Sequence, residues 1–158
     1  MAVEIERKFL LASDGWRAAA QPGVRMLQGY FVQSPGGPSI RIRIVGGRAF
    51  LTVKGSLRNF SRSEFEYEIP VVDAEAMLKE FCGGRYVEKF RYLVPFGGFT
   101  WEVDEYLGDN AGLFTAEIEL EGEDVQFPLP PWLGAEVSAD RRYGNGSLSR
   151  NPYRNWGH

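Results

Sequence analysis

Charged and apolar residues alternate along much of this chain with a period of two. Near the start of the chain, the charged residues Glu4, Glu6 and Lys8 alternate with apolar residues, among them Val3, Ile5 and Phe9. Because successive side chains of a β-strand point to opposite faces, this segment predicts a strand with one charged and one apolar face. The same spacing recurs in six later segments: Arg41 and Arg43; Thr52 and Lys54; Glu64, Glu66 and Glu68; Lys89 and Arg91; Glu102 and Asp104; Glu117 and Glu119.

These segments, and the turn signals between them, predict a strand-rich chain with few helices. Strands are expected at residues 3–10, 25–32, 40–45, 49–54, 63–69, 85–94, 99–106 and 114–121. Glycines and prolines mark turns at 34–38, 46–47 and 95–98. An apolar stripe predicts a helix over 73–81 capped by Asp73, and Ser13 is a candidate cap for a short helix over 13–20. The tail from Ser138 is expected to be partly helical. So many two-faced strands favour a closed sheet with both signs of charge inside and helices outside.

The composition excludes several classes of protein. The chain has 158 residues and a formal net charge of −3, and its acids and bases alternate by strand instead of forming blocks. A nucleic-acid footprint would need a basic face, and no apolar run approaches the ~20 residues that span a bilayer. Cys82 is the only cysteine, so no internal disulfide can form. We expect a single domain over 1–158 in the cytoplasm, without nucleic-acid or membrane partners; a homodimer stays open.

The charged faces carry the candidate chemistry. If they share one interior, desolvating so many charges would cost several kcal/mol each unless a hydrated cavity, a charged ligand and metal ions compensate them. Arginine and lysine suit phosphate oxygens, and clustered carboxylates suit Mg²⁺ or Mn²⁺. The pattern therefore points to a metal-bridged polyphosphate and to phosphoryl transfer. The alternative is an ordinary barrel or sandwich whose charged faces meet water through weak cross-strand ion pairs, and periodicity alone does not exclude it.

The opening Glu4-x-Glu6-x-Lys8 resembles the signature of the CYTH family, the triphosphate tunnel metalloenzymes. The later pairs follow in that family's order, so the resemblance covers nearly the whole chain and is strongest to the short bacterial members. It implies a mostly β (α+β) fold, an eight-stranded antiparallel β-barrel tunnel with helices packed outside. Family members hydrolyse inorganic, thiamine or nucleoside triphosphates, or cyclise ATP. Residues 140–149 resemble a C-terminal segment that can form a helix plugging one end of the tunnel.

The resemblance also implies roles for individual residues. Two divalent ions, Mg²⁺ or Mn²⁺, are expected: the first on Glu4, Glu6 and Glu119, and the second, which activates water, on Asp104 and Glu117, with Glu119 as a further candidate. The triphosphate would be bound by Lys8, Arg41, Arg43, Lys54, Lys89 and Arg91. The supporting residues would be Glu66, Glu68 and Glu102. The candidate catalytic residues are Lys8, Tyr30 and Glu117. Glu64 is balanced between an outer salt bridge and a site role, and Arg7 and Arg62 are expected on the surface.

The leading candidate substrate is inorganic tripolyphosphate, split into pyrophosphate and phosphate. Recognition of an organic triphosphate would be helped by an aromatic side chain at the mouth of the tunnel. Trp101 alternates with Glu102 and Asp104, so its side chain is expected on the outer face, and only Trp16 or Trp132 could reach the rim of the tunnel. The alternatives within the family are an adenylate cyclase and a thiamine or nucleoside triphosphatase. Two further alternatives come from other classes: a polyphosphate-binding module without turnover, and a structural protein with an ordinary barrel.

Overall fold

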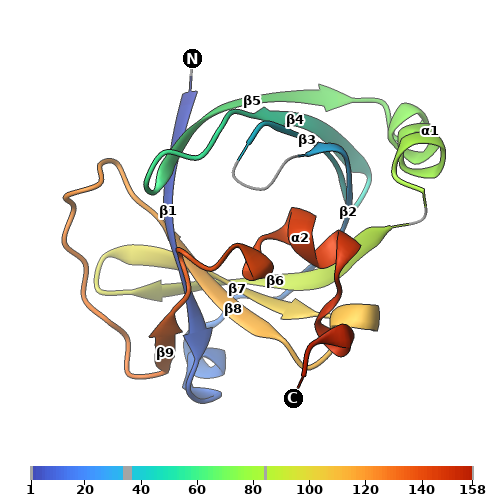
Figure 1. The fold of residues 1–158 in the computed structure, drawn as a ribbon. Helices are drawn as coiled ribbons and strands as arrows, with labels where there is room; N and C mark the ends of the chain where they lie inside the picture. The colour runs from blue at the N-terminus through green and yellow to red at the C-terminus, as the bar shows by residue number, and fades with distance from the viewer. Residues whose placement is uncertain (1, 34–36, 84, 158) are drawn as a thin grey trace.

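The computed structural model describes residues 2–33, 37–83 and 85–157, and its centre is a closed antiparallel barrel (Figure 1). The eight barrel strands are β1 Ala2–Leu11, β2 Val24–Gln33, β3 Ser39–Val45, β4 Arg48–Lys54, β5 Ser61–Ile69, β6 Tyr86–Phe96, β7 Phe99–Tyr106 and β8 Phe114–Glu119. They follow the order β5-β4-β3-β2-β6-β7-β8-β1, and β1 pairs with β5 to close the sheet. A further strand, β9 (Leu133–Glu136), pairs with the end of β1. The expected eight-stranded barrel is therefore confirmed.

The register of the strands gathers the charged side chains on the inner face. Lys8 of β1 lies opposite Glu117 of β8, and Arg91 of β6 lies opposite Asp104 of β7. Residues directly opposite one another in an antiparallel pair have their side chains on the same face of the sheet. The two-residue spacing read from the sequence thus becomes a charged lining around the inside of the barrel.

Apolar side chains cover the outside of the barrel over β1, β7 and β8. Phe9, Trp101 and Val103 point outward from these strands into one buried cluster. Trp16, from the 3-10 helix η1 (Gly15–Ala19), and Trp132, just before β9, complete that cluster. These residues pack against the three strands that carry all five predicted metal ligands.

The helix α1 (Val71–Phe81) covers the outside of β2, β3 and β4 (Figure 1). Its buried residues Ala74 and Leu78 pack against Ile42, with Cys82 in the same cluster. Gly29 of β2 permits this close approach, since a Cβ there would lie only 2.8 Å from Leu78 Cδ2 and 2.9 Å from Cys82 Sγ. The helix therefore rests directly on the backbone behind the inner face of β2.

The C-terminal segment turns back into one end of the barrel (Figure 1). It comprises η3 (Arg141–Tyr143), the short helix α2 (Asn145–Arg150) and η4 (Tyr153–Asn155). Leu148 of α2 is buried against Val87, Tyr106 and Leu113. The partly helical tail is confirmed, and α2 fills one end of the barrel while α1 packs outside it.

Element boundaries differ from the predictions in a few places. Helix α1 begins at Val71, and the residue before it, Pro70, is the N-cap in an extended conformation with φ fixed by its ring. Asp73 therefore lies in the first turn of the helix and is not the cap. η1 begins after Asp14, while the Ser13 hydroxyl only accepts a hydrogen bond from the Gly15 N–H. β9 and the 3-10 helix η2 (Gly108–Asn110) were not predicted. Residues 34–36 of the predicted turn lie outside the described residues. Among those described, no helix has the length and apolar character needed to cross a membrane.

Candidate active site

The barrel encloses a cavity of about 310 Å³ with a largely charged wall. Most of the predicted site residues line it: Glu4, Glu6, Lys8, Tyr30, Arg41, Arg43, Lys54, Glu66, Arg91, Glu102, Glu117 and Glu119. Glu64, whose place the sequence left undecided, lines it too. Lys89 and Asp104 are fully buried and join this wall through Arg91. Glu68 is the exception, because it forms an exposed pair with Arg48 and does not line the cavity.

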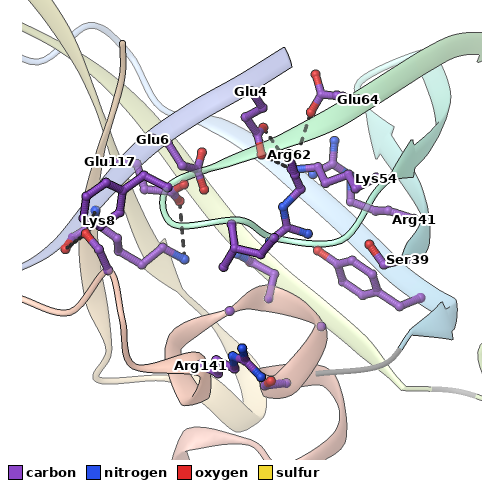
Figure 2. Close-up of a pocket in the computed structure, with 18 of the residues that line it drawn as sticks. Glu4, Glu6, Lys8, Ser39, Arg41, Lys54, Arg62, Glu64, Glu117 and Arg141 are labelled. Carbon is purple, nitrogen blue, oxygen red and sulfur yellow. Dashed lines mark hydrogen bonds and ion pairs between the residues drawn. The ribbon is translucent and has the colours of Figure 1, made fainter. Parts of the chain in front are cut away.

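Lys54 holds two of the acids at one side of the cavity (Figure 2). Its Nζ donates hydrogen bonds of 2.9 and 3.0 Å to the two carboxylate oxygens of Glu4 and lies 3.5 Å from Glu64. Burial raises the pKa of the Glu4 carboxyl, but Lys54 and hydrogen bonding outweigh it and leave that pKa below its ordinary value. For Glu64, burial and the Glu4 carboxylate raise the pKa. Two carboxyl groups thus share one ammonium.

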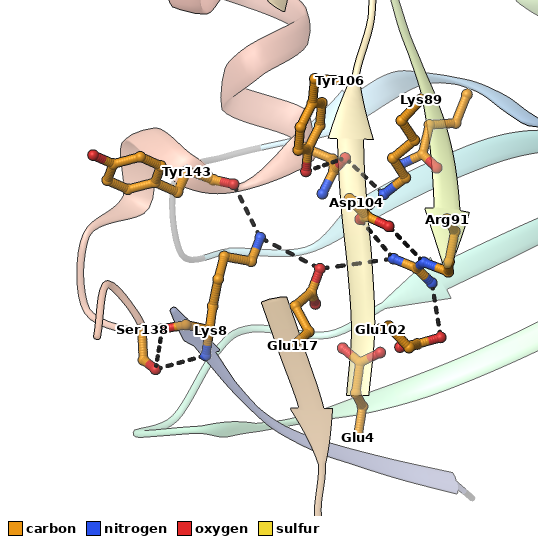
Figure 3. A network of polar contacts seen from close by, with 12 residues as sticks. Glu4, Lys8, Lys89, Arg91, Glu102, Asp104, Tyr106, Glu117, Ser138 and Tyr143 are labelled. Carbon is orange, nitrogen blue, oxygen red and sulfur yellow. Dashed lines mark hydrogen bonds and ion pairs between the residues drawn. The ribbon is translucent and has the colours of Figure 1, made fainter. Parts of the chain in front are cut away.

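Glu117 lies between two cations (Figure 3). Its Oε1 is 3.8 Å from Lys8 Nζ and 3.7 Å from Arg91 Nη2. Burial would raise the pKa of Glu117, yet Lys8 and Arg91 hold it well below its usual range. The neighbouring Glu6 behaves oppositely, since burial and the carboxylates of Glu117 and Glu4 raise its pKa far above the ordinary value. Glu6 therefore favours its protonated form in the protein alone, and its carboxylate form would need a bound cation to compensate the charge.

Arg91 ties together the acids of β7 (Figure 3). Its Nε and Nη2 donate to Asp104 at 2.8 and 2.9 Å, and its Nη1 donates to Glu102 at 3.0 Å. Lys89 Nζ donates to Asp104 at 2.7 Å and to Asn145 Oδ1 at 3.1 Å. Burial lowers the pKa of Lys89 to about 7, with Asp104 opposing the shift and Arg91 adding to it. Lys89 is therefore the one cation of this network that titrates near neutral pH.

Arg41 is connected to Glu66 through Thr52. Arg41 Nη2 donates to Thr52 Oγ1 at 3.2 Å, and that hydroxyl donates to Glu66 at 3.0 Å. Arg41 and Glu66 are themselves 3.6 Å apart. The buried Nε of Arg41 has no hydrogen-bond partner among the described residues. Since an unpaired buried donor is costly, this N–H is suited to an anionic ligand.

Several residues that the sequence analysis did not assign also line the cavity. Arg62 was expected on the surface, but it shares the parity of Glu64 on β5 and lines the wall, a signal that the spacing contains. Arg141 and Asn145 reach the cavity from the C-terminal segment, and Figure 2 shows Arg141 on that side. Lys8 Nζ also donates to the Tyr143 carbonyl at 3.0 Å. Strand parity could not reveal these contacts, because the chain returns to the barrel as short helical turns.

The carboxylates of the wall are candidate ligands for a divalent ion. Over residues 2–33, 37–83 and 85–157, no three His, Cys, Asp or Glu side chains are gathered closely enough to hold a metal. The donor chemistry nevertheless fits Mg²⁺ or Mn²⁺, which take carboxylate oxygens. Glu117 Oε1 is buried without a hydrogen bond, and Glu6 carries a pKa raised by its acidic neighbours. A cation would relieve both conditions, and the assignment of particular ligands stays a prediction.

Aromatic side chains contribute little to the cavity. Trp16, Trp101 and Trp132 are buried in the apolar cluster outside the barrel, so the expectation that Trp16 or Trp132 could reach a rim is wrong. In the described part of the chain, the aromatic residues on the wall are Tyr30 and Phe60. The guanidinium of Arg7 lies 4.5 Å from the centre of the Phe60 ring. The wall therefore offers ionic contacts and no indole surface for an organic base.

Comparisons with known proteins agree with this architecture. The family model described as CYTH domain matches residues 2–152. A protein named inorganic triphosphatase from Acetivibrio thermocellus is 46% identical over 156 residues, covering 99% of each chain. Another of that name from Nitrosomonas europaea is 39% identical over 151 residues, covering 92% of this chain and 96% of the relative.

Solved structures give the same result at the level of the fold. A crystal structure of an inorganic triphosphatase matches with a TM-score of 0.66 and 36% identity, covering 94% of this chain and 95% of the other. A protein from Pyrococcus horikoshii, 23% identical, matches with a TM-score of 0.59 over 77% and 80% of the two chains, which supports the fold alone. The family model matches residues 2–152, and the two relatives align over nearly the whole chain, so this chain belongs to the CYTH domain family.

Proposed function

We propose that this chain is a divalent-metal-dependent inorganic triphosphatase that hydrolyses tripolyphosphate to pyrophosphate and phosphate. The observation that carries the proposal is the cavity inside the barrel, whose wall combines a set of cations with a set of acids. Both bacterial relatives are named inorganic triphosphatase and align over nearly their full length. The reaction class is therefore hydrolysis of a phosphoanhydride.

The basic side chains would bind the substrate. Arg41, Arg43 and Arg91 present guanidinium groups, which suit the paired oxygens of a phosphate, while Lys8 and Lys54 act as point charges. Lys8 and Arg91 already approach the same oxygen of Glu117 from two sides. A triphosphate bound among these cations would have its terminal phosphoryl group held in a fixed orientation, which is the main contribution of a protein to phosphoryl transfer.

The acidic side chains would hold the metal. We assign Glu4, Glu6 and Glu119 to a first ion and Asp104 and Glu117, with Glu119, to a second, either Mg²⁺ or Mn²⁺. Divalent ions at these carboxylates would neutralise phosphate charge and lower the pKa of a bound water. Lys54 donates a hydrogen bond to Glu4, and Arg91 donates one to Asp104. These cations keep the carboxylates deprotonated and oriented.

The reaction balances without any group beyond water. A bond forms between the water oxygen and the terminal phosphorus, and the bridging P–O bond breaks. Pyrophosphate leaves with the bridging oxygen, and the proton of the water passes to solvent. Arg91 and Lys8 stabilise the negative charge that spreads over the phosphoryl oxygens, because they are fixed before the reaction begins.

The choice of tripolyphosphate rests on what the wall lacks. Recognition of adenine or thiamine would require stacking or hydrogen-bonding groups beside the triphosphate, and the tryptophans of this chain lie elsewhere. A cyclase would further require a base for the ribose hydroxyl. The described wall is instead lined mainly by charged side chains, which suit phosphate oxygens, with Tyr30 and Phe60 as its aromatic residues.

The proposal is tested by measuring initial rates of phosphate release from tripolyphosphate, thiamine triphosphate and ATP in parallel, with EDTA, Mg²⁺ or Mn²⁺. Metal-dependent release chiefly from tripolyphosphate is expected. Preference for an organic triphosphate, or cyclic AMP in the ATP arm, would move the function elsewhere in the family. Absence of turnover together with a triphosphate-induced rise in melting temperature would instead support a binding module.

A further inference from the structure

Gln28 of β2 is a buried amide whose two ends both contact candidate site residues. Its side chain is 0% exposed. Its Oε1 accepts a hydrogen bond of 2.9 Å from Arg43 Nε, and its Nε2 donates a hydrogen bond of 2.8 Å to the Tyr30 hydroxyl. Gln28 thus connects one of the expected phosphate-binding arginines with one of the candidate catalytic residues.

The backbone around Gln28 fixes this arrangement. In the pairing of β2 with β3, Gln28 lies opposite Arg43 and Tyr30 lies opposite Arg41, so all four side chains share the inner face. The register shifts immediately after Tyr30, at an irregularity of the kind that re-aims side chains beside active sites. Helix α1 packs on Gly29 from outside. The strand is therefore packed by α1 on its outer face, while the amide is held by hydrogen bonds on the inner face.

The orientation of the amide follows from the donors that surround it. A guanidinium can only donate hydrogen bonds, so the amide oxygen must face Arg43 and the amide nitrogen must face Tyr30. The Tyr30 oxygen then acts as an acceptor, and its own proton is left to donate elsewhere. Among the described residues, no acceptor for this proton is found, and Tyr30 lines the cavity. An anion in the cavity would receive it.

The hydrogen bond to Gln28 orients Arg43 without neutralising its positive charge. Arg41 and Arg91 each have carboxylate partners, whereas Arg43 forms no salt bridge within the part of the chain that the structure describes. Burial, with Arg41 and Arg91 nearby, lowers the pKa of Arg43 to about 10, which leaves it protonated at neutral pH. A neutral amide in place of a carboxylate orients the guanidinium without neutralising it, and its Nη groups stay available for phosphate.

We propose that Gln28 is a positioning residue that directs the Tyr30 hydroxyl and the Arg43 guanidinium toward the triphosphate. It acts through these two groups and does not itself react. The inference rests on the proposed function, since it assigns a residue to the site of that reaction. It adds a neutral residue to the charged side chains that the strands present to the cavity.

The test compares Gln28→Glu and Gln28→Leu with wild type, measuring kcat and KM for tripolyphosphate and the melting temperature. Glu has the size of Gln, but its carboxylate would pair with Arg43 and accept the Tyr30 proton. We expect it to raise KM and lower kcat, reducing kcat/KM by about tenfold or more, the size of a hydrogen bond to a charged group. Gln28→Leu should lower kcat/KM comparably. In a Tyr30→Phe background, Gln28→Leu should reduce kcat/KM by a smaller factor, because part of the effect of Gln28 depends on the Tyr30 hydroxyl.

Asn110→Ala is the matched control, because Asn110 is a buried amide that contacts the Tyr153 backbone and does not line the cavity. It should lower the melting temperature and leave kcat/KM within about twofold. Activity of both Gln28 variants within twofold of wild type, or full additivity with Tyr30→Phe and with Arg43→Ala, would overturn the inference. Tripolyphosphate binding is measured on the same proteins. A wild type that binds without turnover would overturn the proposed function, and the affinities would still decide the role of Gln28.

Discussion

Leu148 offers a direct test of whether the C-terminal segment is part of the barrel. Its side chain is 1% exposed and packs against Val87, Tyr106 and Leu113 at one end of the barrel. Replacement of a buried leucine by alanine costs about 2–5 kcal/mol of unfolding free energy, through lost burial and the cavity that remains. With about 3 kcal/mol and a sensitivity of about 2–4 °C per kcal/mol for a chain of this size, Leu148→Ala should lower the melting temperature by about 6–12 °C.

The assay is thermal and urea unfolding, with Leu129→Ala as the control. Leu129 is 64% exposed, so its replacement should change stability by no more than about 0.5 kcal/mol. Release of α2 would also remove the acceptors that Tyr143 and Asn145 provide to Lys8 and Lys89, so tripolyphosphate turnover should fall. A melting temperature for Leu148→Ala within about 1 °C of that for Leu129→Ala would show instead that α2 lies outside the cooperative unit of the barrel.

Three further predictions concern the charged lining. Arg43→Ala should raise KM and lower kcat for tripolyphosphate together, with about a 10–100-fold loss of kcat/KM, because charge-assisted hydrogen bonds are lost in both the ground and transition states; an unchanged steady-state rate would remove Arg43 from the site. Lys54→Arg should reduce turnover by about tenfold, since a larger planar cation would hold the Glu4 carboxylate more firmly; wild-type kinetics would show that only the charge matters. For Lys89, the folded pKa of about 7 lies below the unfolded value of about 10.4. Between these pH values the unfolded chain binds more protons, so in EDTA the unfolding free energy should rise with pH by up to about 1.4 kcal/mol per unit. Urea unfolding between pH 7 and 9 should show a flatter dependence for Lys89→Met, and an identical slope would contradict the assignment.

Periodicity predicted the barrel well, because a closed sheet imposes one rule on every strand. Glu4, Arg41 and Glu117 lie on different strands, yet each could be placed on the inner face from its spacing. Glu68 obeys the same parity but lies at the end of β5, where it meets Arg48 at the surface. Parity gives the face of a residue and not its depth along the barrel, so the prediction failed there.

Other features depend on contacts between distant segments, which spacing cannot reveal. Gln28 carries no charge, so nothing in the alternating pattern set it apart from a strand-forming polar residue. Asn145 reaches Lys89 only because the tail folds back into the barrel. Arg62 is different, since it has the same parity as Glu64 on β5, and this spacing alone indicates the inner face on which it lies.

The acidic lining of the barrel is proposed to support metal-dependent hydrolysis of tripolyphosphate. The decisive experiment measures steady-state phosphate release from tripolyphosphate during titration with Mg²⁺ or Mn²⁺, for wild type and for Glu117→Gln. We predict that wild type is inactive in EDTA and turns over with added metal, while Glu117→Gln keeps triphosphate affinity and loses turnover. Equal rates with EDTA and with metal, or full activity of Glu117→Gln, would exclude a catalytic metal ion at these carboxylates.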